Sequence, residues 1–303
     1  MIVRPHPSAL SLFFILRGSI LRAIVGELLA VCAIAFLVVL LHGWLPWLFS
    51  GLTLPSFTVL GLALSIFLGF RNNVCYQRWW EARRQWGQLI AETRAFLRDV
   101  RALLPDDDGA SRRMGYRAIA FAHALRCQLR KEEIRSVEAW LPPEEWEAVA
   151  ALRGKPDRIL HFQAREIAAH LRGGLISDIL YRNFSDRLNA MSGIQAACER
   201  LHTTPTPFAY TLLLHRTAWL FCLLLPFGLV STLGLATPVV TVILAYAFFG
   251  LDALGQELQE PFEATDNAVP LDALVRTIEI ATLEVVGGRP VPEPLKPRDY
   301  VLL

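Results

Sequence analysis

The sequence of 303 residues predicts an all-α integral membrane protein, with four transmembrane helices and a large helical domain outside the bilayer. Charged residues make up 19% of the chain, whereas ordinary soluble domains carry about 25%. Two tracts, Leu28–Phe70 and Thr217–Leu251, contain no Asp, Glu, Lys or Arg. Each tract can hold a helical hairpin, because one membrane span needs about 20 mostly apolar residues. This pattern excludes a disordered chain and a small disulfide scaffold.

Residues 1–22 are expected to form an amphipathic helix at the membrane interface. Arg4, Arg17 and Arg22 flank the apolar run Leu10–Leu16. A secretory signal also begins with basic residues, but here two of the arginines follow the apolar run and no small-residue cleavage site comes before the long tract. An interfacial helix that leads into the first span therefore fits better.

The first transmembrane hairpin is expected over residues 23–70, with spans at about 23–43 and 53–70. Trp44 and Trp47 stand at the turn between them, where aromatic side chains mark a membrane interface. Glu27 is the only acidic residue expected inside a span. The turns at 42–55 and 232–238 carry no charge, whereas arginines follow Phe70 closely. The positive-inside rule therefore places both termini and the segment after Phe70 in the cytoplasm.

Residues 71–207 are expected to form the cytosolic helical domain. Apolar residues recur there at helical spacing, as in Trp86, Leu89 and Ile90, and strand signals are few. The second transmembrane hairpin is expected over 208–255. A cytosolic segment at 256–303 completes the chain, with a helix at 271–286 followed by a proline-rich tail.

The sequence shows no enzyme signature and no sign of a cofactor. It lacks a phosphate-binding loop, a His-Glu-x-x-His zinc motif and a Gly-x-Ser-x-Gly nucleophile motif. The five cysteines are scattered without a Cys-x-x-Cys pair, which is typical of unpaired thiols. A net charge of +2 gives no basis for nucleic-acid binding. His215 and Arg216 are expected to be an interfacial pair that bonds to backbone or to carboxylates, although a functional role stays open.

The second expected span carries two four-residue repeats. Gly61, Ser65 and Gly69 form a stripe of small residues that allows helices to approach closely. The other repeat is shifted by one residue, about 100° around the helix, and consists of apolar side chains: Leu62, Ile66 and Phe70. If several subunits surround an axis, these side chains form rings that gate a pore by dewetting. Periodicity alone leaves open that they face lipid or a neighbouring helix.

Several segments resemble the bestrophin family, and in its short C-terminal region the chain is similar to the bacterial branch. Order and spacing agree over nearly the whole chain. The matching segments are Phe70-Arg71-Asn72-Asn73, Arg78-Trp79-Trp80-Glu81, Pro205-x-Pro207-Phe208-Ala209-Tyr210, His215-Arg216-Thr217, Leu224-Leu225-Pro226-Phe227-Gly228 and Glu260-Pro261-Phe262.

The resemblance implies a homopentameric ion channel in a bacterial inner membrane, with one axial pore. It assigns the pore neck to Leu62, Ile66 and Phe70, the positions that periodicity also selects. It assigns a second constriction, the cytosolic aperture, to Ile179, with Leu180 or Ile176 as alternatives if an insertion or deletion shifts the count.

Calcium binding is expected to be weak or absent. Animal bestrophins bind calcium through an acidic run after Pro-Phe. Here only Glu260, Glu263 and Asp266 are candidates, and a calcium site takes six to eight oxygen ligands.

The ion that passes is expected to be a monovalent cation, as the resemblance to bacterial bestrophins implies. Glu81 and Asp178 are candidate selectivity charges, since acidic rings favour cations. Glu81 can instead pair with Arg78 or Arg84 at helical spacing. The alternatives are an anion channel, which the 22 Lys and Arg against 17 Asp and Glu in residues 71–207 would suit, and a membrane-anchored scaffold for a cytosolic partner.

Overall fold

The computed structural model describes residues 1–4, 10, 15, 18–44, 54–104 and 108–303. Most of the interfacial helix expected over 1–22 and the turn with Trp47 lie outside these residues. The described residues are helical apart from loops and isolated bridges such as Ile2 with Val301. The helices are α2 (Leu21–Trp44), α3 (Leu54–Leu103), α4 (Asp108–Arg130), α5 (Arg135–Glu138), α6 (Pro143–Ala150), α7 (Lys155–Arg172), α8 (Asp178–Thr203), α9 (Phe208–Leu233), α10 (Thr237–Gln259) and α11 (Leu271–Val286).

The chain divides into two compact units, which are described separately. We call the first the apolar unit; it comprises Arg4–Trp79 and Pro205–Glu260. The second, the charged unit, comprises Met1–Val3, Trp80–Thr204 and Pro261–Leu303. Helix α3 contributes to both units. The span expected to end at Phe70 therefore continues as helix to Leu103.

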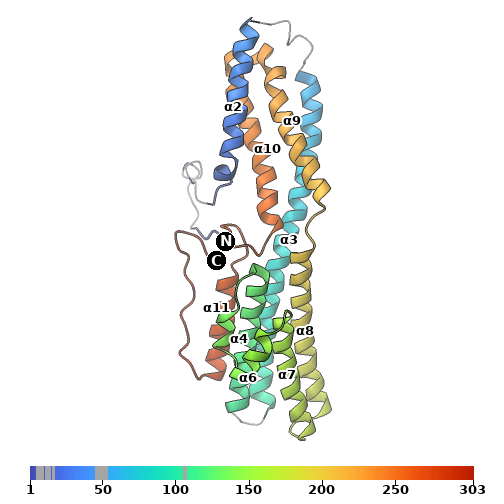
Figure 1. Ribbon diagram of the computed structural model, residues 1–303, viewed down its shortest axis with the longest axis vertical. Helices are drawn as coiled ribbons and strands as arrows, with labels where there is room; N and C mark the ends of the chain where they lie inside the picture. The colour runs from blue at the N-terminus through green and yellow to red at the C-terminus, as the bar shows by residue number, and fades with distance from the viewer. Residues whose placement is uncertain (5–9, 11–14, 16–17, 45–53, 105–107) are drawn as a thin grey trace. The chain divides into compact units, whose positions relative to one another are not determined.

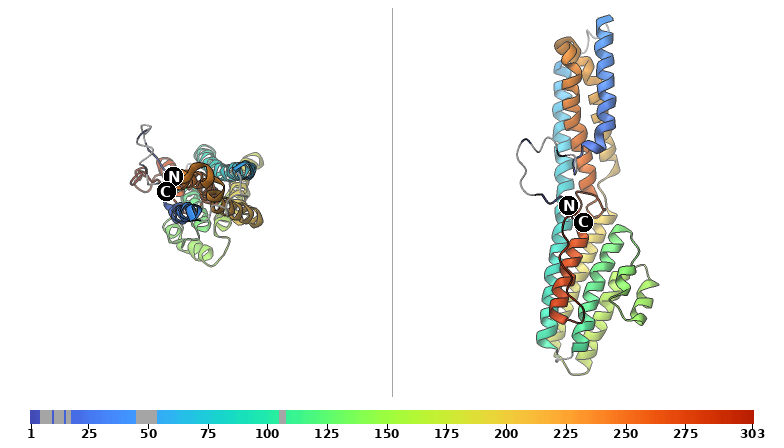
Figure 2. Two further views of the ribbon diagram at one scale, coloured as in Figure 1. Left: turned by 90° about the horizontal axis from the view of Figure 1, so that it is seen from above. Right: turned by 90° about the vertical axis from the view of Figure 1, so that its left-hand side faces the viewer.

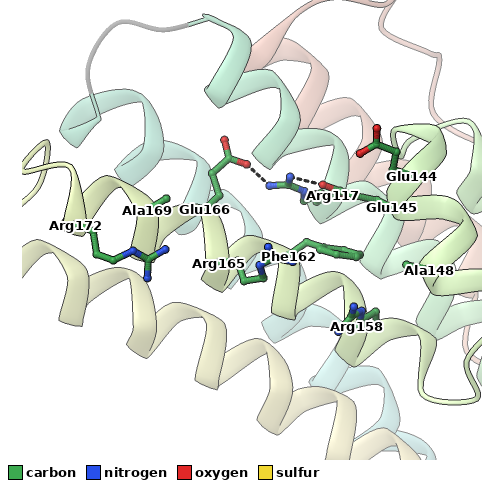
Figure 3. A pocket seen from close by; sticks show the side chains of 10 residues that line it. All are labelled: Arg117, Glu144, Glu145, Ala148, Arg158, Phe162, Arg165, Glu166, Ala169 and Arg172. Carbon is green, nitrogen blue, oxygen red and sulfur yellow. Dashed lines mark hydrogen bonds and ion pairs between the residues drawn. The ribbon is translucent and has the colours of Figure 1, made fainter.

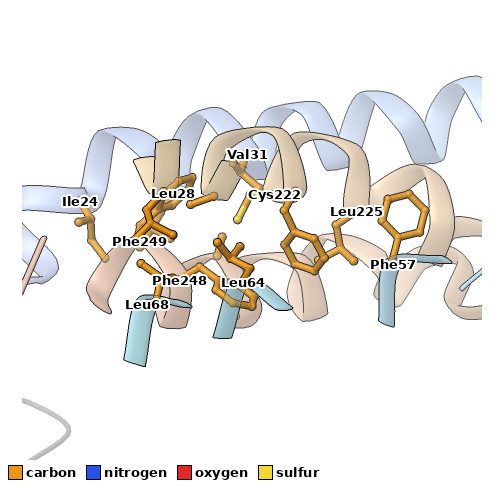
Figure 4. Close-up of a cluster of buried hydrophobic side chains, with 14 of the residues drawn as sticks. Ile24, Leu28, Val31, Phe57, Leu64, Leu68, Cys222, Leu225, Phe248 and Phe249 are labelled. Atoms are coloured by element: carbon orange, nitrogen blue, oxygen red, sulfur yellow. The ribbon is translucent and has the colours of Figure 1, made fainter. Parts of the chain in front are cut away.

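The apolar unit consists of α2, the first part of α3, α9 and α10. Helices α2, α9 and α10 pack side by side (Figures 1 and 2). Their core is a cluster of aliphatic and aromatic side chains that includes Leu64 and Leu68 of α3 and Phe248 of α10 (Figure 4). Phe221 and Phe248 meet edge to face with ring centroids 5.0 Å apart, a favoured aromatic geometry.

Many large apolar side chains are exposed on the surface of the apolar unit. Leu29 and Phe36 on α2 are 66% and 59% exposed, and Leu213 and Leu220 on α9 are 63% and 58% exposed. A helix that is apolar on all sides belongs in an apolar environment. Three stretches of the described chain are long and apolar enough to cross a membrane: Leu21–Trp44, Phe57–Leu103 and Phe208–Gln259.

A tight turn divides the third stretch into α9 and α10. The 3₁₀ turn Gly234–Ala236 joins the two helices, and Gly234 has a φ of 52°. A side chain at this φ would crowd the backbone, so glycine suits the end of α9. Pro238 follows in the first turn of α10, where its missing N–H costs no helical hydrogen bond.

The charged unit consists of the second part of α3 with α4 to α8 and α11. Its core is built around large buried side chains, among them Trp86 and Phe96 of α3, Phe121 of α4 and Phe184 of α8. Phe96 and Phe184 meet edge to face at 6.1 Å between centroids. The helix expected over 271–286 is α11, which packs on α4 and places Glu279 2.6 Å from Nε2 of His123.

Candidate functional site

The first part of α3 presents one buried and one exposed apolar face. Leu64 and Leu68 are 2% and 0% exposed and belong to the core of the apolar unit. Leu62, Ile66 and Phe70 are 63%, 49% and 62% exposed. Side chains four residues apart lie on one face of a helix, so these three form a continuous apolar row. We call this row the neck face.

The small-residue stripe runs beside the neck face. A Cβ atom at Gly61 would lie 3.0 Å from the Phe221 ring of α9, so this glycine brings α3 close to α9. The Ser65 hydroxyl donates a 2.7 Å hydrogen bond to the carbonyl of Gly61, which satisfies its polar group within the helix. A Cβ at Gly69 would meet nothing within 4 Å. Within one subunit, close helix packing is therefore seen at Gly61 and not at Gly69.

A buried charge cluster fixes α3 directly after the neck face. Arg71 is 1% exposed and pairs with Asp252 of α10, which is 3% exposed. The other carboxylate oxygen of Asp252 lies 2.7 Å from Nδ1 of His215 on α9 and accepts a 3.3 Å bond from the amide of Gln256. Three helices are thus joined through one carboxylate. Removing one partner of a buried pair leaves an uncompensated charge, which makes such a cluster a strong positional constraint.

Gly255 permits the close approach of α10 to this part of α3. A Cβ at position 255 would lie 2.8 Å from the side-chain oxygen of Asn72 and 3.4 Å from Cζ of Arg71. An alanine at position 255 would therefore force the Asn72 side chain to shift, so glycine suits this close approach. The neck face and Arg71 lie on one continuous helix.

Sequence reasoning missed the role of Asp252. It identified Glu27 as the only acidic residue in a span, whereas Asp252 lies within α10 and is buried. His215 does bond to a carboxylate, as expected of an interfacial histidine, and the carboxylate is that of Asp252. The one available signal was the Arg71 charge placed directly after an apolar span, which calls for an acidic partner on a neighbouring helix.

Ile179 and Asp178 lie at the beginning of α8 in the charged unit. Ser177 caps this helix by accepting a bond from the backbone N–H of Leu180. Ile179 is 80% exposed and Asp178 is also exposed, whereas the alternative Ile176 is 5% exposed. Of these two isoleucines, only Ile179 has a side chain free to line an opening.

Glu81 carries little uncompensated charge. Its carboxylate pairs with Arg84, one of the two partners that helical spacing predicts. It also accepts a 2.6 Å bond from the side-chain amide of Gln85. A carboxylate engaged in this way on its own helix offers little charge to a passing ion.

The last turns of α3, in the charged unit, expose positive charge. The two acidic residues there, Glu92 and Asp99, are partly buried, and both pair with Arg187 of α8. The charged residues that are exposed after Gln88 on this helix are all arginines, namely Arg94, Arg98 and Arg101. The helix that bears the neck face therefore also carries an exposed arginine face.

The expected weak calcium ligands do not converge with other donors. Glu263 and Asp266 are exposed, and Glu260 is partly buried. Within the described part of the chain, no group of three or more His, Cys, Asp or Glu side chains is placed to hold a metal ion.

Comparisons with known proteins agree with one another. The family model described as "Bacterial/Fungal Bestrophin protein" matches residues 1–284. The "voltage-dependent anion channel-forming protein YneE" of Salmonella typhi is 43% identical over 293 residues, which is 96% of each chain. The protein of the same name from Escherichia coli K12 is 42% identical over the full length of both chains. A crystal structure of a bacterial bestrophin homologue from Klebsiella pneumoniae matches with a TM-score of 0.85 at 38% identity, covering 88% of this chain and all of the other.

Proposed function

Because the chain belongs to the bacterial and fungal bestrophin family, we propose that it forms an ion channel in which five copies surround one pore and contribute Leu62, Ile66 and Phe70 to its neck. The observation that carries this proposal is the exposure of these three side chains on a helix whose opposite face is fully packed. Membership of this family points to a transport protein and not to an enzyme.

The neck would act as a hydrophobic gate. Rings of apolar side chains in a narrow passage hold water poorly, and an ion cannot cross a dry segment without losing its hydration. Arg71, which forms the buried anchor with Asp252, directly follows Phe70, so the last ring lies next to a buried ion pair between α3 and α10. A small change at this anchor would therefore alter the neck directly.

The ion is better assigned as an anion than as a cation. The expectation of cations came from the resemblance to bacterial bestrophins, with Glu81 and Asp178 as candidate selectivity charges. Glu81 is compensated by Arg84, which leaves Asp178 as the one candidate. The curated relatives carry the name "anion channel-forming protein", which favours the alternative. The exposed arginines Arg94 and Arg98 agree with it, because basic residues that line a vestibule concentrate anions.

The membrane arrangement belongs to the same proposal. Helices α2, α9 and α10 and the first part of α3 would be the four spans, within hairpins at 23–70 and 208–255. The segments 1–22, 71–207 and 256–303 and both termini would lie on the cytoplasmic side of a bacterial inner membrane. Ile179 would form the second constriction, where the pore opens to the cytoplasm.

A pair of cysteine variants tests whether the neck face lines a pore. Ile66 and Phe67 are neighbours with nearly equal exposure, 49% and 51%, but they point about 100° apart. Ile66→Cys and Phe67→Cys are prepared with Cys32 changed to Ala; the other four cysteines are buried. Each variant is recorded in a planar bilayer before and after a charged, membrane-impermeant thiol reagent is added.

We expect the reagent to change the current of Ile66→Cys and to leave that of Phe67→Cys unchanged. Equal sensitivity of the two variants, or none in either, would contradict the assignment of the neck. A folded oligomer that carries no current at all would instead support the scaffold alternative.

A further inference from the structure

A pocket of about 350 Å³ in the charged unit lies between the first half of α4, the connection from α5 to α6 and the chain that follows α11. This volume is at the lower end of the range of about 300–1,000 Å³ that is typical of small-molecule sites. Tyr116 and Trp140 form an aromatic wall, and the charged residues among the described lining are all arginines, namely Arg112, Arg113 and Arg289. The proposed pore assigns this pocket no role.

The chain after α11 turns sharply to bring Arg289 into this pocket. Gly287 and Gly288 have φ values of 63° and 84°, a region that other residues disfavour. A Cβ at Gly288 would lie 2.5 Å from the hydroxyl oxygen of Tyr116 and 2.9 Å from Cδ of Arg112, so glycine suits this crossing. The Tyr116 hydroxyl donates a 3.4 Å hydrogen bond to the carbonyl of Gly287. The tail is thus held against α4 beside the Arg112 side chain.

The Arg289 guanidinium is fixed by the aromatic wall. Its central carbon lies 4.5 Å from the centre of the Trp140 ring and 5.3 Å from that of the Tyr116 ring. The two rings meet edge to face with centroids 5.5 Å apart. Nη2 of Arg289 donates to the carbonyl of Ala139. Because a guanidinium has five N–H donors, those on Nε and Nη1 stay available to an anion.

The connection from α5 to α6, which supplies part of the aromatic wall, is fixed to α4 at two points. Trp140 stacks on the His123 ring of α4 with centroids 6.3 Å apart. Nε of Arg117 in α4 donates a 2.9 Å bond to Glu145 in α6 (Figure 3). A wall that is already ordered needs little rearrangement when a ligand binds, which favours affinity.

Two of the three arginines in the pocket carry uncompensated charge. Arg113 donates a 2.8 Å bond to Glu166, which also pairs with Arg117 (Figure 3). Burial alone would raise the pKa of Glu166, but these two arginines hold it below its ordinary value, so the carboxylate stays charged. Arg112 and Arg289 form no ion pair with any residue that the structure describes. The pocket therefore suits a ligand with two negative charges.

We propose that this pocket binds a small aliphatic dicarboxylate, with one carboxylate on Arg112 and the other on Arg289. A guanidinium matches a carboxylate with two parallel N–H donors. A single phosphate would have to draw both arginines to one point, whereas Arg289 is fixed over Trp140 and bonded to Ala139. Two separate carboxylates let each arginine keep its place. The proposal does not depend on the channel function.

Calorimetric titration of the full-length, detergent-solubilised protein at low salt tests the site. The probes are succinate, butyrate, which has the same chain length but one carboxylate, and inorganic phosphate. We expect saturable binding of succinate, with butyrate and phosphate bound about tenfold more weakly or less, because each loses the charge-assisted bonds to one arginine. Failure of succinate to bind, or binding of butyrate or phosphate as tight as that of succinate, would overturn the assignment.

Matched single variants locate the site. Arg112→Gln removes one carboxylate partner and should weaken succinate binding by about tenfold or more, toward the affinity of butyrate. Arg165→Gln removes the same charge from an exposed position of α7 that does not line the pocket, and it should change binding less than about twofold. Equal losses in the two variants would indicate general attraction by a basic surface and contradict the proposal.

A conservative variant tests the carboxylate placed on the tail. Arg289→Lys keeps the positive charge but removes the planar fork of donors held over Trp140. It should weaken succinate binding and reduce the preference for succinate over butyrate. An unchanged preference would overturn the placement of a carboxylate on Arg289. Unfolding temperatures of all variants, measured without ligand, verify that the walls of the pocket have kept their structure.

Discussion

Helix α3 passes through both units. Its inner face carries buried apolar side chains in both parts, whereas its outer face is apolar in the first part and carries arginines in the second. In the apolar unit its inner face contributes Leu64 and Leu68, and in the charged unit it contributes Trp86; all three are at most 2% exposed. The outer face carries Ile66 in the first part and Arg94 in the second. The inner residues determine how α3 packs, whereas the outer residues indicate the medium that surrounds it.

The two parts also contain two ion pairs of very different kinds. Arg71 and Asp252 are both buried, with side chains 1% and 5% exposed, and they join α3 to α10. Arg84 and Glu81 lie three residues apart on α3, with side chains 65% and 23% exposed. A pair within one exposed helix surface contributes little, whereas a buried pair between helices constrains their positions. The following predictions test this contrast.

The largest expected effect is the loss of the buried anchor. Asp252→Asn leaves the Arg71 charge buried without an anionic partner and should lower the free energy of unfolding by about 3–5 kcal/mol. Thermal unfolding of the detergent-solubilised protein measures the change. Arg84→Gln, the matched control on the exposed pair, should cost less than about 1 kcal/mol. Similar losses in both variants would mean that the buried pair has no special role.

The next largest effect is the loss of stability when a glycine at a close contact between helices is replaced by alanine. A Cβ at Gly228 of α9 would overlap the Phe57 ring, so Gly228→Ala should cost about 1–3 kcal/mol by overpacking. Gly69→Ala meets no atom of its own subunit and should leave the subunit as stable or slightly more so, because alanine favours helix. Size-exclusion chromatography sharpens the comparison: dissociation of the oligomer by Gly69→Ala would place this glycine at a contact between subunits.

Widening the neck should increase the current. Changing Leu62, Ile66 and Phe70 together to Ala removes the apolar rings, and a barrier lowered by about 1.4 kcal/mol raises the ion flux about tenfold. Single-channel recording in planar bilayers measures open probability and conductance. The matched control is Phe67→Ala, which changes an equally exposed residue of the same helix outside the neck face. Unaltered currents from a folded triple variant would contradict the gate.

The smallest effect is an acid-dependent loss of stability in the charged unit. Arg113 and Arg117 lower the pKa of Glu166 below its ordinary value of 4.5. The Glu166 carboxylate therefore takes up a proton more readily in the unfolded chain than in the folded chain. The stabilisation is complete above about pH 4.5 and is lost as the pH falls through the lower pKa of the folded state. Unfolding followed by tryptophan fluorescence should show a weaker acid dependence in Glu166→Gln than in the wild type. An unchanged acid profile would assign the dependence to other carboxylates.

The sequence predicted the helical fold well because apolar tracts and helical periodicity are local signals. Helices α2 and α11 begin and end close to the expected positions. The end of the second span was harder to predict, because Arg71 is the first charged residue after the apolar tract and was therefore placed outside the membrane. It is instead buried against Asp252, a partner 181 residues away that no local pattern reveals.

The candidate site also has one feature that local sequence signals predicted and others that they could not. The spacing of Leu62, Ile66 and Phe70 predicted a shared apolar face, and the structure exposes that face. Its position around a pore remains a prediction, because one subunit cannot display an axis. The sign of the ion depends on charges brought together by several subunits, so counting the residues of one chain could not determine it.

The reversal potential of purified protein in a planar bilayer under a KCl gradient tests the central claim most directly. An anion channel should reverse near the equilibrium potential of chloride, and Arg94→Glu with Arg98→Glu should move this value toward that of potassium. A wild-type reversal near the potassium potential would contradict the anion assignment. The absence of current from both the wild type and the triple alanine variant would contradict the channel itself.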